Sequence, residues 1–330
     1  MIRTLLRLTL WAILIAALAA GCLAWWLVDA DTARPAQQVT LQIPQGSSVT
    51  DIGRQLETAG VLRSATAFGL YVRARGDGRS IQAAEYVFTP HMSMLGVVGV
   101  LDAGGRPPTV WITIPEGFTA AQIGALLQKH GIGTRDEFMA VVGATSLRFG
   151  PAASRGLEGY LFPDTYEVRR DATPRDVAAL LTAHFMHELP RDYVSAARKL
   201  GRTVPQIVTA ASLIEREAKV DPERPVMASV YYNRLHRGMP LQVDATIEYA
   251  LPTHKTALSF ADLKIDSPYN TYLYAGLPPT PIANPGRASL YAAFHPASTG
   301  YLYYVYRGNG HHQFSDTLEE QQAAERRFLP

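Results

Sequence analysis

The sequence has almost no cysteine, and its charges of opposite sign nearly cancel. Cys22 is the only cysteine among 330 residues, so no internal disulfide can form and the cysteine count does not indicate a redox compartment. Lys and Arg together number 31, Asp and Glu 29, and the formal net charge is +2. Proteins that bind nucleic acid usually carry a concentrated basic excess. The chain is therefore not expected to bind nucleic acid.

Several catalytic signatures are also missing. The sequence contains no H-E-x-x-H motif, no paired C-x-x-C, no G-x-S-x-G motif and no glycine-rich loop of the phosphate-binding kind. These motifs supply zinc ligands, a serine nucleophile or a cradle for phosphate groups. Their absence argues against zinc-dependent hydrolysis, nucleophile-elbow chemistry and phosphate chemistry. The sequence predicts no metal and no cofactor.

One long uncharged run lies near the start of the chain. Residues 8–28 read LTLWAILIAALAAGCLAWWLV, which as a helix would be about 31 Å long and would cross a bilayer. Arg3 and Arg7 precede the run and acidic residues follow it, so the positive-inside rule places residues 1–7 in the cytoplasm and exports the remainder. The sequence therefore predicts a single-pass transmembrane anchor, followed by a polar linker at residues 29–38.

Two other interpretations of this run stay open. A cleaved signal peptide has a similar apolar core, and AAGC places Cys22 after small residues, as in a lipoprotein signal. The run continues apolar beyond Cys22, and its length favours an uncleaved anchor. Lipidation of Cys22 is the alternative to that anchor.

An internal repeat follows the linker. Residues 41–61 and 112–132 are related by an offset of 71 and share the I-P-x-G motif and further apolar and glycine positions. Each copy is typical of a short strand, a Pro-x-Gly turn and an amphipathic helix that ends at glycine. In the first copy, a second helix at about 64–75 and a strand in EYVFTP complete a strand-helix-helix-strand unit.

The unit at residues 39–105 resembles a LysM-like module, a kind of domain that binds the glycan backbone of cell-wall polymers. A purely structural role for it stays open, because a fold alone does not fix a function.

Residues 106–330 are expected to form one mixed domain. From about Gly156 the composition shifts toward tyrosine, proline and asparagine. The predicted elements do not alternate regularly, since they are helices at about 205–219, 222–237 and 287–294 and a strand at 301–306. This pattern favours an α+β class over a doubly wound sheet.

The predicted helix at 205–219 carries two acids in its apolar half. On an idealised helical wheel, Glu217 falls between Leu213 and Ala210, Glu215 lies near the other margin of the apolar arc, and Arg216 points away. A carboxyl group among apolar side chains has a raised pKa, so it can stay protonated near neutral pH and act as a general acid. The alternative is that each glutamate pairs with an arginine or lysine elsewhere.

Seven sequence blocks, in order along the chain, resemble the endolytic murein transglycosylases of the YceG-like family. They are LEGYLFPDTY, ASLIEREA, VYYNRL, MPLQVDATIEYAL, DSPYNTYLYAGLPPTPIANPG, AAFHPASTGYLYYV and HHQFSDTLEE. The resemblance covers nearly the whole chain, including the anchor and the LysM-like module. It implies an enzyme that cleaves the β-1,4 bond between MurNAc and GlcNAc inside nascent peptidoglycan strands and leaves a 1,6-anhydro end.

The resemblance assigns the catalytic role to Glu217. Its carboxyl group would protonate the leaving glycosidic oxygen and then accept the proton of the sugar's own 6-hydroxyl as that group attacks the anomeric carbon. The water-activating partner of inverting glycosidases would not be needed. Candidate supporting or substrate-binding residues, each of which could instead be a turn, cap or structural residue, are Glu215, Glu158, Asp164, Gln242, Asp244, Asn270, Tyr272 and His312.

The resemblance also implies a location and partners. Most of the chain would lie on the outer face of a bacterial inner membrane, with peptidoglycan glycan strands as substrate. Peptidoglycan synthases are implied as partners, although no segment identifies one. The competing interpretation is a non-enzymatic, membrane-anchored protein that binds the cell wall as a scaffold and whose acids are structural.

Overall fold

The computed structural model describes residues 38–76, 81–89, 92–253, 255 and 258–328, together with helical residues 11, 13–19 and 21–22. The predicted cytoplasmic segment 1–7 lies outside the described residues, as do many positions of the anchor 8–28 and nearly all of the linker 29–38. Among the described helices, none combines the length and the apolar character that a bilayer crossing requires. Cys22 is exposed and forms no disulfide.

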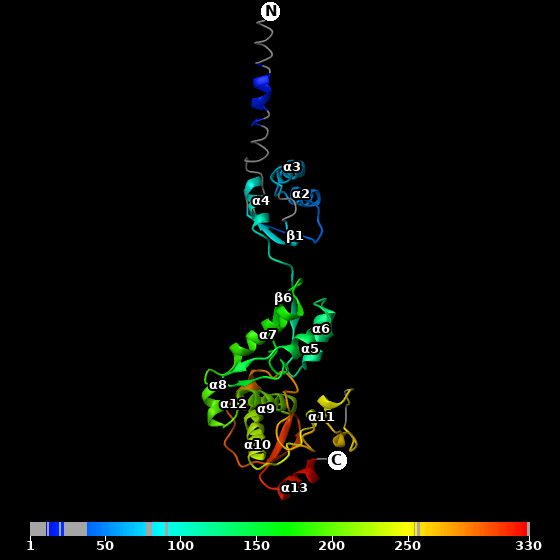
Figure 1. The fold of residues 1–330 in the computed structure, drawn as a ribbon, viewed down its shortest axis with the longest axis vertical. Coiled ribbons are helices and arrows are strands. Elements are labelled where there is room, and N and C mark those ends of the chain that lie inside the picture. Colours follow the sequence, from blue (N-terminus) through cyan, green and yellow to red (C-terminus); the bar gives the residue numbers. More distant parts are fainter. Residues whose placement is uncertain are drawn as a thin grey trace, which may run out of the picture. The chain divides into compact units, whose positions relative to one another are not determined.

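The chain divides into two compact units after Thr109 (Figure 1). The first unit contains β1 (Val39–Ile43), α2 (Val49–Thr58), α3 (Ala65–Arg75), β2 (Ala84–Phe88) and α4 (Met94–Asp102). β1 and β2 pair in antiparallel fashion. Their inward residues and those of the helices form one apolar core that includes Ile52, Leu56, Phe68, Tyr86 and Phe88.

The second unit begins with the second copy of the repeat. It contains β3 (Thr109–Thr113), α5 (Ala120–Lys129), α6 (Arg135–Ala144) and, after a loop and the short hairpin of β4 (Arg148–Phe149) and β5 (Ala152–Ala153), β6 (Thr165–Arg169), which pairs with β3. The predicted repeat is therefore present as two strand-helix-helix-strand units.

The same local signals start the first helix of each copy. Ser48 caps α2 with Asp51, and Thr119 caps α5 with Gln122, each as a capping box. The turn glycines Gly46 and Gly117 have φ values of 82° and 75°, which side chains other than glycine rarely adopt.

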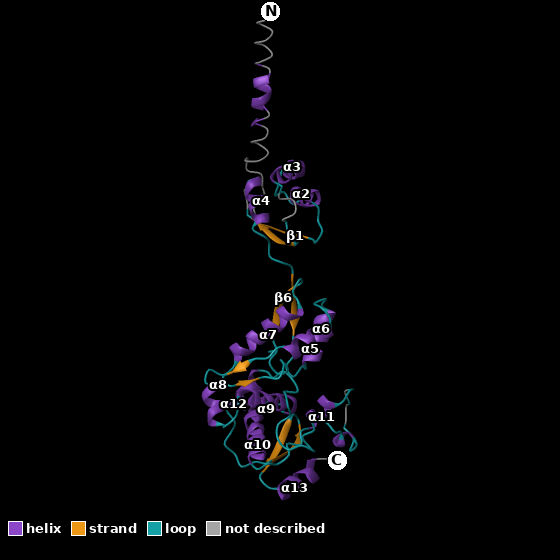
Figure 2. Cartoon of the chain, viewed as in Figure 1, coloured by secondary structure: helices purple, strands orange, loops and turns teal. Residues whose placement is uncertain are grey.

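The remainder of the second unit is largely helical (Figure 2). Its helices are α7 (Pro174–Glu188), α8 (Tyr193–Lys199), α9 (Val204–Glu217), α10 (Arg224–His236), α11 (Asp244–Ala250), α12 (Arg287–Phe294) and α13 (Leu318–Phe328), with 3-10 turns at Asp221–Glu223 and Asp262–Lys264. A second hairpin joins β7 (Tyr303–Gly308) to β8 (His311–Ser315). Each sheet in the described residues has two strands, so the class is mixed α+β, as predicted, and not doubly wound.

Helix α9 is at the centre of this part of the fold. α8, α10, α11 and α12 all contact it, and Ile207, Val208, Ala211 and Ile214 are completely buried. Thr203 caps its start in a capping box with Gln206. The helix ends at Glu217, two residues earlier than predicted, because Ala218 has an extended backbone with a ψ of 125°.

Candidate active site

Glu217 is the last residue of α9, and its carboxyl group lies among groups from three other segments. The backbone N–H of Ala245 and the hydroxyl of Tyr304 both donate hydrogen bonds to it, the latter at 3.4 Å from Oε2. Burial of the carboxyl group, with the nearby negative charge of Asp244 as the next cause, raises the pKa of Glu217 to about 7. The group is therefore partly protonated at neutral pH.

Asp244 and Tyr272 lie beside Glu217, as a pair. Asp244 is the first residue of α11, and the hydroxyl of Tyr272 donates a hydrogen bond to its Oδ1. Asp244 is exposed, whereas Tyr272 is partly buried. The structure thus places two of the sequence-predicted residues, Asp244 and Tyr272, beside the carboxyl group of a third, Glu217.

Tyr304 is held by an aromatic cluster that includes His312. The Tyr304 and Tyr231 hydroxyl oxygens are 3.2 Å apart, and the rings of Tyr304 and His312 meet edge to face with centroids 5.6 Å apart. Nδ1 of His312 lies 2.8 Å from Oε2 of Glu223, which also accepts the backbone N–H of His312. Burial acts to raise the pKa of Glu223, but these hydrogen bonds outweigh it and lower the pKa. His312 is thus placed to support Tyr304.

Gln242 and Asn270 organise the loops that carry Asp244 and Tyr272. Gln242 has a φ of 54°, and its Oε1 accepts a hydrogen bond from Arg234 at 3.2 Å. Asn270 is completely buried. Its amide donates to the carbonyls of residues 263 and 265, and its Oδ1 accepts from the N–H of Tyr272. The Asn270 side chain is thus used within its own loop, whereas Gln242 is exposed and bonds to Arg234 through Oε1.

Glu215 has a different environment from Glu217. Its Oε2 accepts the N–H of Gly286 at 3.0 Å and lies 3.5 Å from Nη1 of Arg224. The side chains of Glu215 and Arg224 are only 6% and 9% exposed. The alternative of a structural ion pair, which the sequence left open for both glutamates, therefore describes Glu215.

Glu158 joins three segments that are distant in sequence. Its carboxylate accepts the N–H of Ala120 at 3.0 Å, Nδ2 of Asn284 at 3.0 Å and the hydroxyl of Tyr249 at 3.3 Å. Burial raises the pKa of Glu158 to about 7, against the opposing effect of these hydrogen bonds. Glu158 thus caps α5 and fixes it to the loop before α12 and to α11.

Asp164 lies elsewhere, at the start of β6. Its Oδ1 accepts the N–H of Thr165 at 2.7 Å, and its Oδ2 is 3.6 Å from Nε2 of His184. This is the turn role that the sequence left open, and in the described part of the chain Asp164 lines neither of the two cavities described next.

Two cavities adjoin at the end of α9. The first, about 440 Å³, is lined by Arg216, Glu217, Lys219, Asp244, Ala245, Glu248 and Lys255. The second, about 530 Å³, shares Arg216, Ala245 and Glu248 with the first, and its further lining includes Gln122, Arg135, Glu158 and Tyr249. The shared residues place the two cavities side by side, with Glu217 in the first and Glu158 in the second. The described residues that line the first cavity include no histidine or cysteine, the ligands that zinc prefers.

An ion pair between Arg216 and Glu248 separates the two cavities. Their Nη2 and Oε2 atoms are 3.0 Å apart. The helical wheel directed Arg216 away from the apolar face, but α11 packs beside α9 at that point and supplies Glu248. Sequence reasoning missed Glu248 and Tyr304, although both lie inside sequence blocks that it singled out, and it missed the nearby cations Lys219 and Lys255.

Comparisons with known proteins indicate the family of the chain. The sequence pattern of the YceG-like family matches residues 41–327. A protein named endolytic murein transglycosylase from Bacillus subtilis is 36% identical over 308 residues, which cover 88% of this chain and 85% of that protein. One of the same name from Streptococcus pneumoniae is 32% identical, over 81% of this chain and 54% of that protein.

A solved structure of a YceG-like protein is also similar to this chain. The crystal structure of a YceG-like protein from Listeria monocytogenes is similar with a TM-score of 0.58 and 31% sequence identity, over 88% of this chain and 99% of that chain. Taken with the match over residues 41–327, these similarities establish that the chain belongs to the YceG-like family.

Proposed function

We propose that this protein is a lytic transglycosylase that cleaves peptidoglycan strands internally, at the β-1,4 bond between MurNAc and GlcNAc. The observation that carries the proposal is the carboxyl group of Glu217, which lines a cavity and whose pKa burial raises to about 7. A group that stays protonated near neutral pH is suited to protonate a leaving oxygen. The relatives named endolytic murein transglycosylase support the same assignment.

In the proposed reaction, one carboxyl group acts twice. Glu217 donates its proton to the glycosidic oxygen, and the bond between that oxygen and C1 of MurNAc breaks. The 6-hydroxyl of the same MurNAc then forms a bond to C1, and its proton passes to the Glu217 carboxylate. The acid is restored, the product ends in 1,6-anhydroMurNAc, and no water is consumed.

Asp244 has two effects in this proposal. Its negative charge raises the pKa of Glu217, which keeps the acid protonated before the reaction. The same charge would stabilise the positive charge that develops on the sugar ring as the bond to C1 breaks. The hydrogen bond from Tyr272 fixes the Asp244 side chain in this position.

The two cavities are of a kind that suits a glycan strand. Their volumes are about 440 and 530 Å³, and both are lined in part by charged side chains that can bond to sugar hydroxyl and acetamido groups, with the amide of Gln122 in the second. A strand that occupies both cavities would cross the ion pair of Arg216 and Glu248 between Tyr249 and Glu217.

The wider arrangement is part of the same proposal. Residues 39–105 would be a LysM-like module that holds glycan, and residues 106–330 the catalytic domain. Residues 8–28 would anchor the protein in the bacterial inner membrane with the N-terminus in the cytoplasm. There the enzyme would trim or terminate nascent strands beside peptidoglycan synthases. The antiparallel strand-helix-helix-strand unit of the first domain supports the module.

Mass spectrometry of the products tests the reaction type. The protein is incubated with uncrosslinked glycan strands, with Glu217→Gln as the control variant. We expect internal fragments with anhydro ends, each lighter by one water than a reducing end, and almost none with the variant. Reducing ends would indicate hydrolysis instead. Strand binding without cleavage by the wild-type protein would support the non-enzymatic scaffold.

A further inference from the structure

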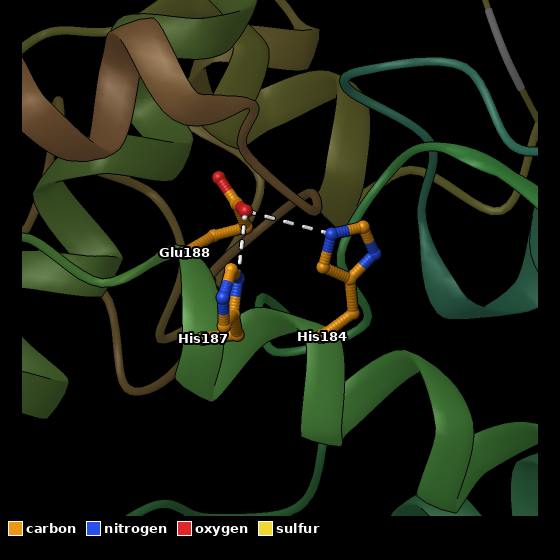
Figure 3. A group of neighbouring side chains, drawn as sticks. All are labelled: His184, His187 and Glu188. Atoms are coloured by element: carbon orange, nitrogen blue, oxygen red, sulfur yellow. Dashed lines mark hydrogen bonds and ion pairs between the residues drawn. The ribbon is translucent and has the colours of Figure 1, made fainter.

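A second group of polar side chains lies at the end of α7. His184, His187 and Glu188 are at positions i, i+3 and i+4 of this helix, so they share one face. Figure 3 shows both imidazole rings directed at the same carboxylate oxygen of Glu188. None of the three lines the two cavities beside Glu217. The cluster is therefore separate from the proposed catalytic site.

The distances in this cluster match those between the ligands of one metal ion. Oε1 of Glu188 lies 3.1 Å from Nδ1 of His187 and 3.5 Å from Nε2 of His184. The same Nε2 lies 3.6 Å from Oδ2 of Asp164, across the loop before β6. Zinc bonds to nitrogen and oxygen are about 2.0–2.2 Å, so two ligands of a tetrahedral site are about 3.3–3.6 Å apart.

The hydrogen bonds of His184 leave Nε2 free to be a ligand. Its Nδ1 is 3.0 Å from the hydroxyl of Tyr166, and that hydroxyl donates its only proton to the carbonyl of Phe162 at 2.7 Å. The hydroxyl oxygen of Tyr166 must therefore accept a hydrogen bond from Nδ1–H of His184. In the neutral ring, the lone pair is then on Nε2 and faces the two carboxylates. A hydrogen bond from the second ring nitrogen is the usual support of a histidine that binds a metal.

The carboxylates are also held in place. The second oxygen of Glu188 pairs with Nη2 of Arg287 at 2.5 Å, and the Glu188 side chain is only 5% exposed. The second oxygen of Asp164 accepts the N–H of Thr165. His187, in contrast, is 83% exposed, so an ion can reach the cluster from solvent. The Glu188 carboxylate is thus oriented before an ion binds.

We propose that His184, His187 and Glu188 form a binding site for Zn²⁺ or a similar transition-metal ion. Two imidazole nitrogens with a carboxylate suit zinc better than magnesium, which prefers oxygen ligands alone. Three protein ligands leave the fourth position of a tetrahedral site for a water molecule. Asp164, 3.6 Å from Nε2 of His184, lies beside the site. The order H-x-x-H-E differs from H-E-x-x-H, so the sequence alone predicted no metal.

Zinc titration of the whole chain tests this site. The protein is purified with an affinity tag that contains no histidine, treated with chelator and then freed of it. Calorimetry with ZnCl₂ should give one ion bound per chain, and MgCl₂ should give no comparable binding. Co²⁺ should produce the visible absorption of a tetrahedral site. Bound Zn²⁺ should raise the melting temperature, because it binds the folded state.

Three variants make the test specific to these residues. His187→Ala removes an exposed ligand and should leave the fold intact, while the His184→Ala, His187→Ala double variant should lose at least 100-fold in zinc affinity. Tyr166→Phe removes only the hydroxyl that orients His184 and should weaken binding by about 10- to 100-fold. The matched control is the double variant His130→Ala, His236→Ala, which removes two histidines at the ends of α5 and α10 and should bind as the wild type does.

The outcomes are distinct. A single zinc ion that is lost in the double variant at 184 and 187 and kept in the control supports the site. Absence of zinc binding by the folded wild-type chain would overturn it, and the cluster would then be a set of structural polar contacts. Zinc that binds equally well to the double variant at 184 and 187 would also overturn it. Neither result depends on glycan cleavage.

Discussion

Glu215 and Glu217, two residues apart on α9, differ in the groups that contact their carboxyl oxygens. Glu215 meets the cation of Arg224, 3.5 Å away, whereas Glu217 accepts hydrogen bonds from the neutral groups of Ala245 and Tyr304. Burial favours the protonated form of a carboxyl group, and it raises the pKa of Glu217 to about 7 against the opposing effect of Lys219. Glu217 also lines a cavity, whereas Glu215 lines neither of the two described cavities and is held in an ion pair. Glu217, and not Glu215, is therefore the candidate general acid.

The first prediction concerns Asp244. Its negative charge is a cause of the raised pKa of Glu217, so Asp244→Asn should lower that pKa. Activity requires protonated Glu217 and should fall as the pH rises past its pKa. The alkaline limb of the pH profile of kcat/KM should therefore move to lower pH in this variant. Glu319→Gln, at an exposed acid of α13, is the control and should not move the limb. An unchanged limb in Asp244→Asn would argue against this coupling.

At the level of single residues, the sequence predicted which residues belong to the candidate site better than it predicted which groups contact them. The helical wheel placed Glu217 in the apolar arc, because the period of α9 can be read from the sequence. It could not show Tyr304, which reaches Glu217 from a strand 87 positions later. Nor could it show that the amide of Asn270 is used up inside its own loop. Such contacts depend on tertiary packing, which no local pattern contains.

Among the elements, the loop at Glu158 depends on a close approach of the Gly159 backbone to the ring of Pro281. Gly159 has a φ of 88°, and a Cβ at this position would lie 2.4 Å from Pro281. No side chain fits there without movement of one of the two loops. This contact brings Glu158 next to Asn284, and through it α5 is fixed beside the second cavity.

The second prediction follows from this contact. Gly159→Ala should lower the free energy of unfolding by about 2 kcal/mol or more, because it adds a clash to a strained φ. Gly143→Ala is the matched control: Gly143 lies in α6, and a Cβ there would meet no atom within 4 Å. The control should be neutral or slightly stabilising, since alanine favours helix. Urea unfolding of both variants checks this. Equal effects would contradict the role of the contact.

The elements themselves were predicted where local signals are strong. Glycine stops marked the ends of α2 and α5, helical periodicity marked α9, and α12 lies where it was expected. The structure adds a capping box at the start of α2, α5 and α9. β7 begins at Tyr303, two residues later than predicted, because its register is set by pairing with β8. The predicted helix at 222–237 begins with a 3-10 turn over Asp221–Glu223. The sequence did not predict β6 as the closing strand of the second repeat copy, because a loop and a hairpin separate it from α6.

For the whole molecule, the buried carboxyl groups of Glu158 and Glu217 set a pH dependence of stability. Burial raises the pKa of each from 4.5 to about 7. Between these values the folded state holds protons that the unfolded state has lost. The stabilising contribution is therefore complete below about pH 4.5 and is lost as the pH rises through 7.

The third prediction uses Glu217→Gln to isolate one of these groups. Glutamine does not titrate, so the variant should gain stability relative to the wild type as the pH rises from about 4.5 to 7, by up to about 3 kcal/mol. Urea unfolding at pH 4.5, 6 and 8 measures the difference. Glu319→Gln should show no such trend. A difference that is constant with pH would mean that Glu217 titrates normally in the folded state.

The fourth prediction concerns the proposed LysM-like module. Deletion of residues 38–104 should reduce cleavage of long glycan strands more than cleavage of short fragments, because the module would hold the polymer and take no part in the chemistry. The ratio of kcat/KM for the two substrates measures this effect. Equal losses on both substrates would count against a role in binding and would favour a structural one.

The assignment of Glu217 as both acid and base is tested most directly by the rate at which Glu217→Gln and Glu215→Gln release anhydro-ended fragments from glycan strands. Circular dichroism first establishes that each variant is folded. Glu217→Gln keeps the shape of the side chain but cannot transfer the proton, so its rate should fall by about 10²- to 10⁴-fold or more. Glu215→Gln weakens the pair with Arg224 and should cost less per folded molecule. Near-normal release by Glu217→Gln, with Glu215→Gln inactive, would contradict the account.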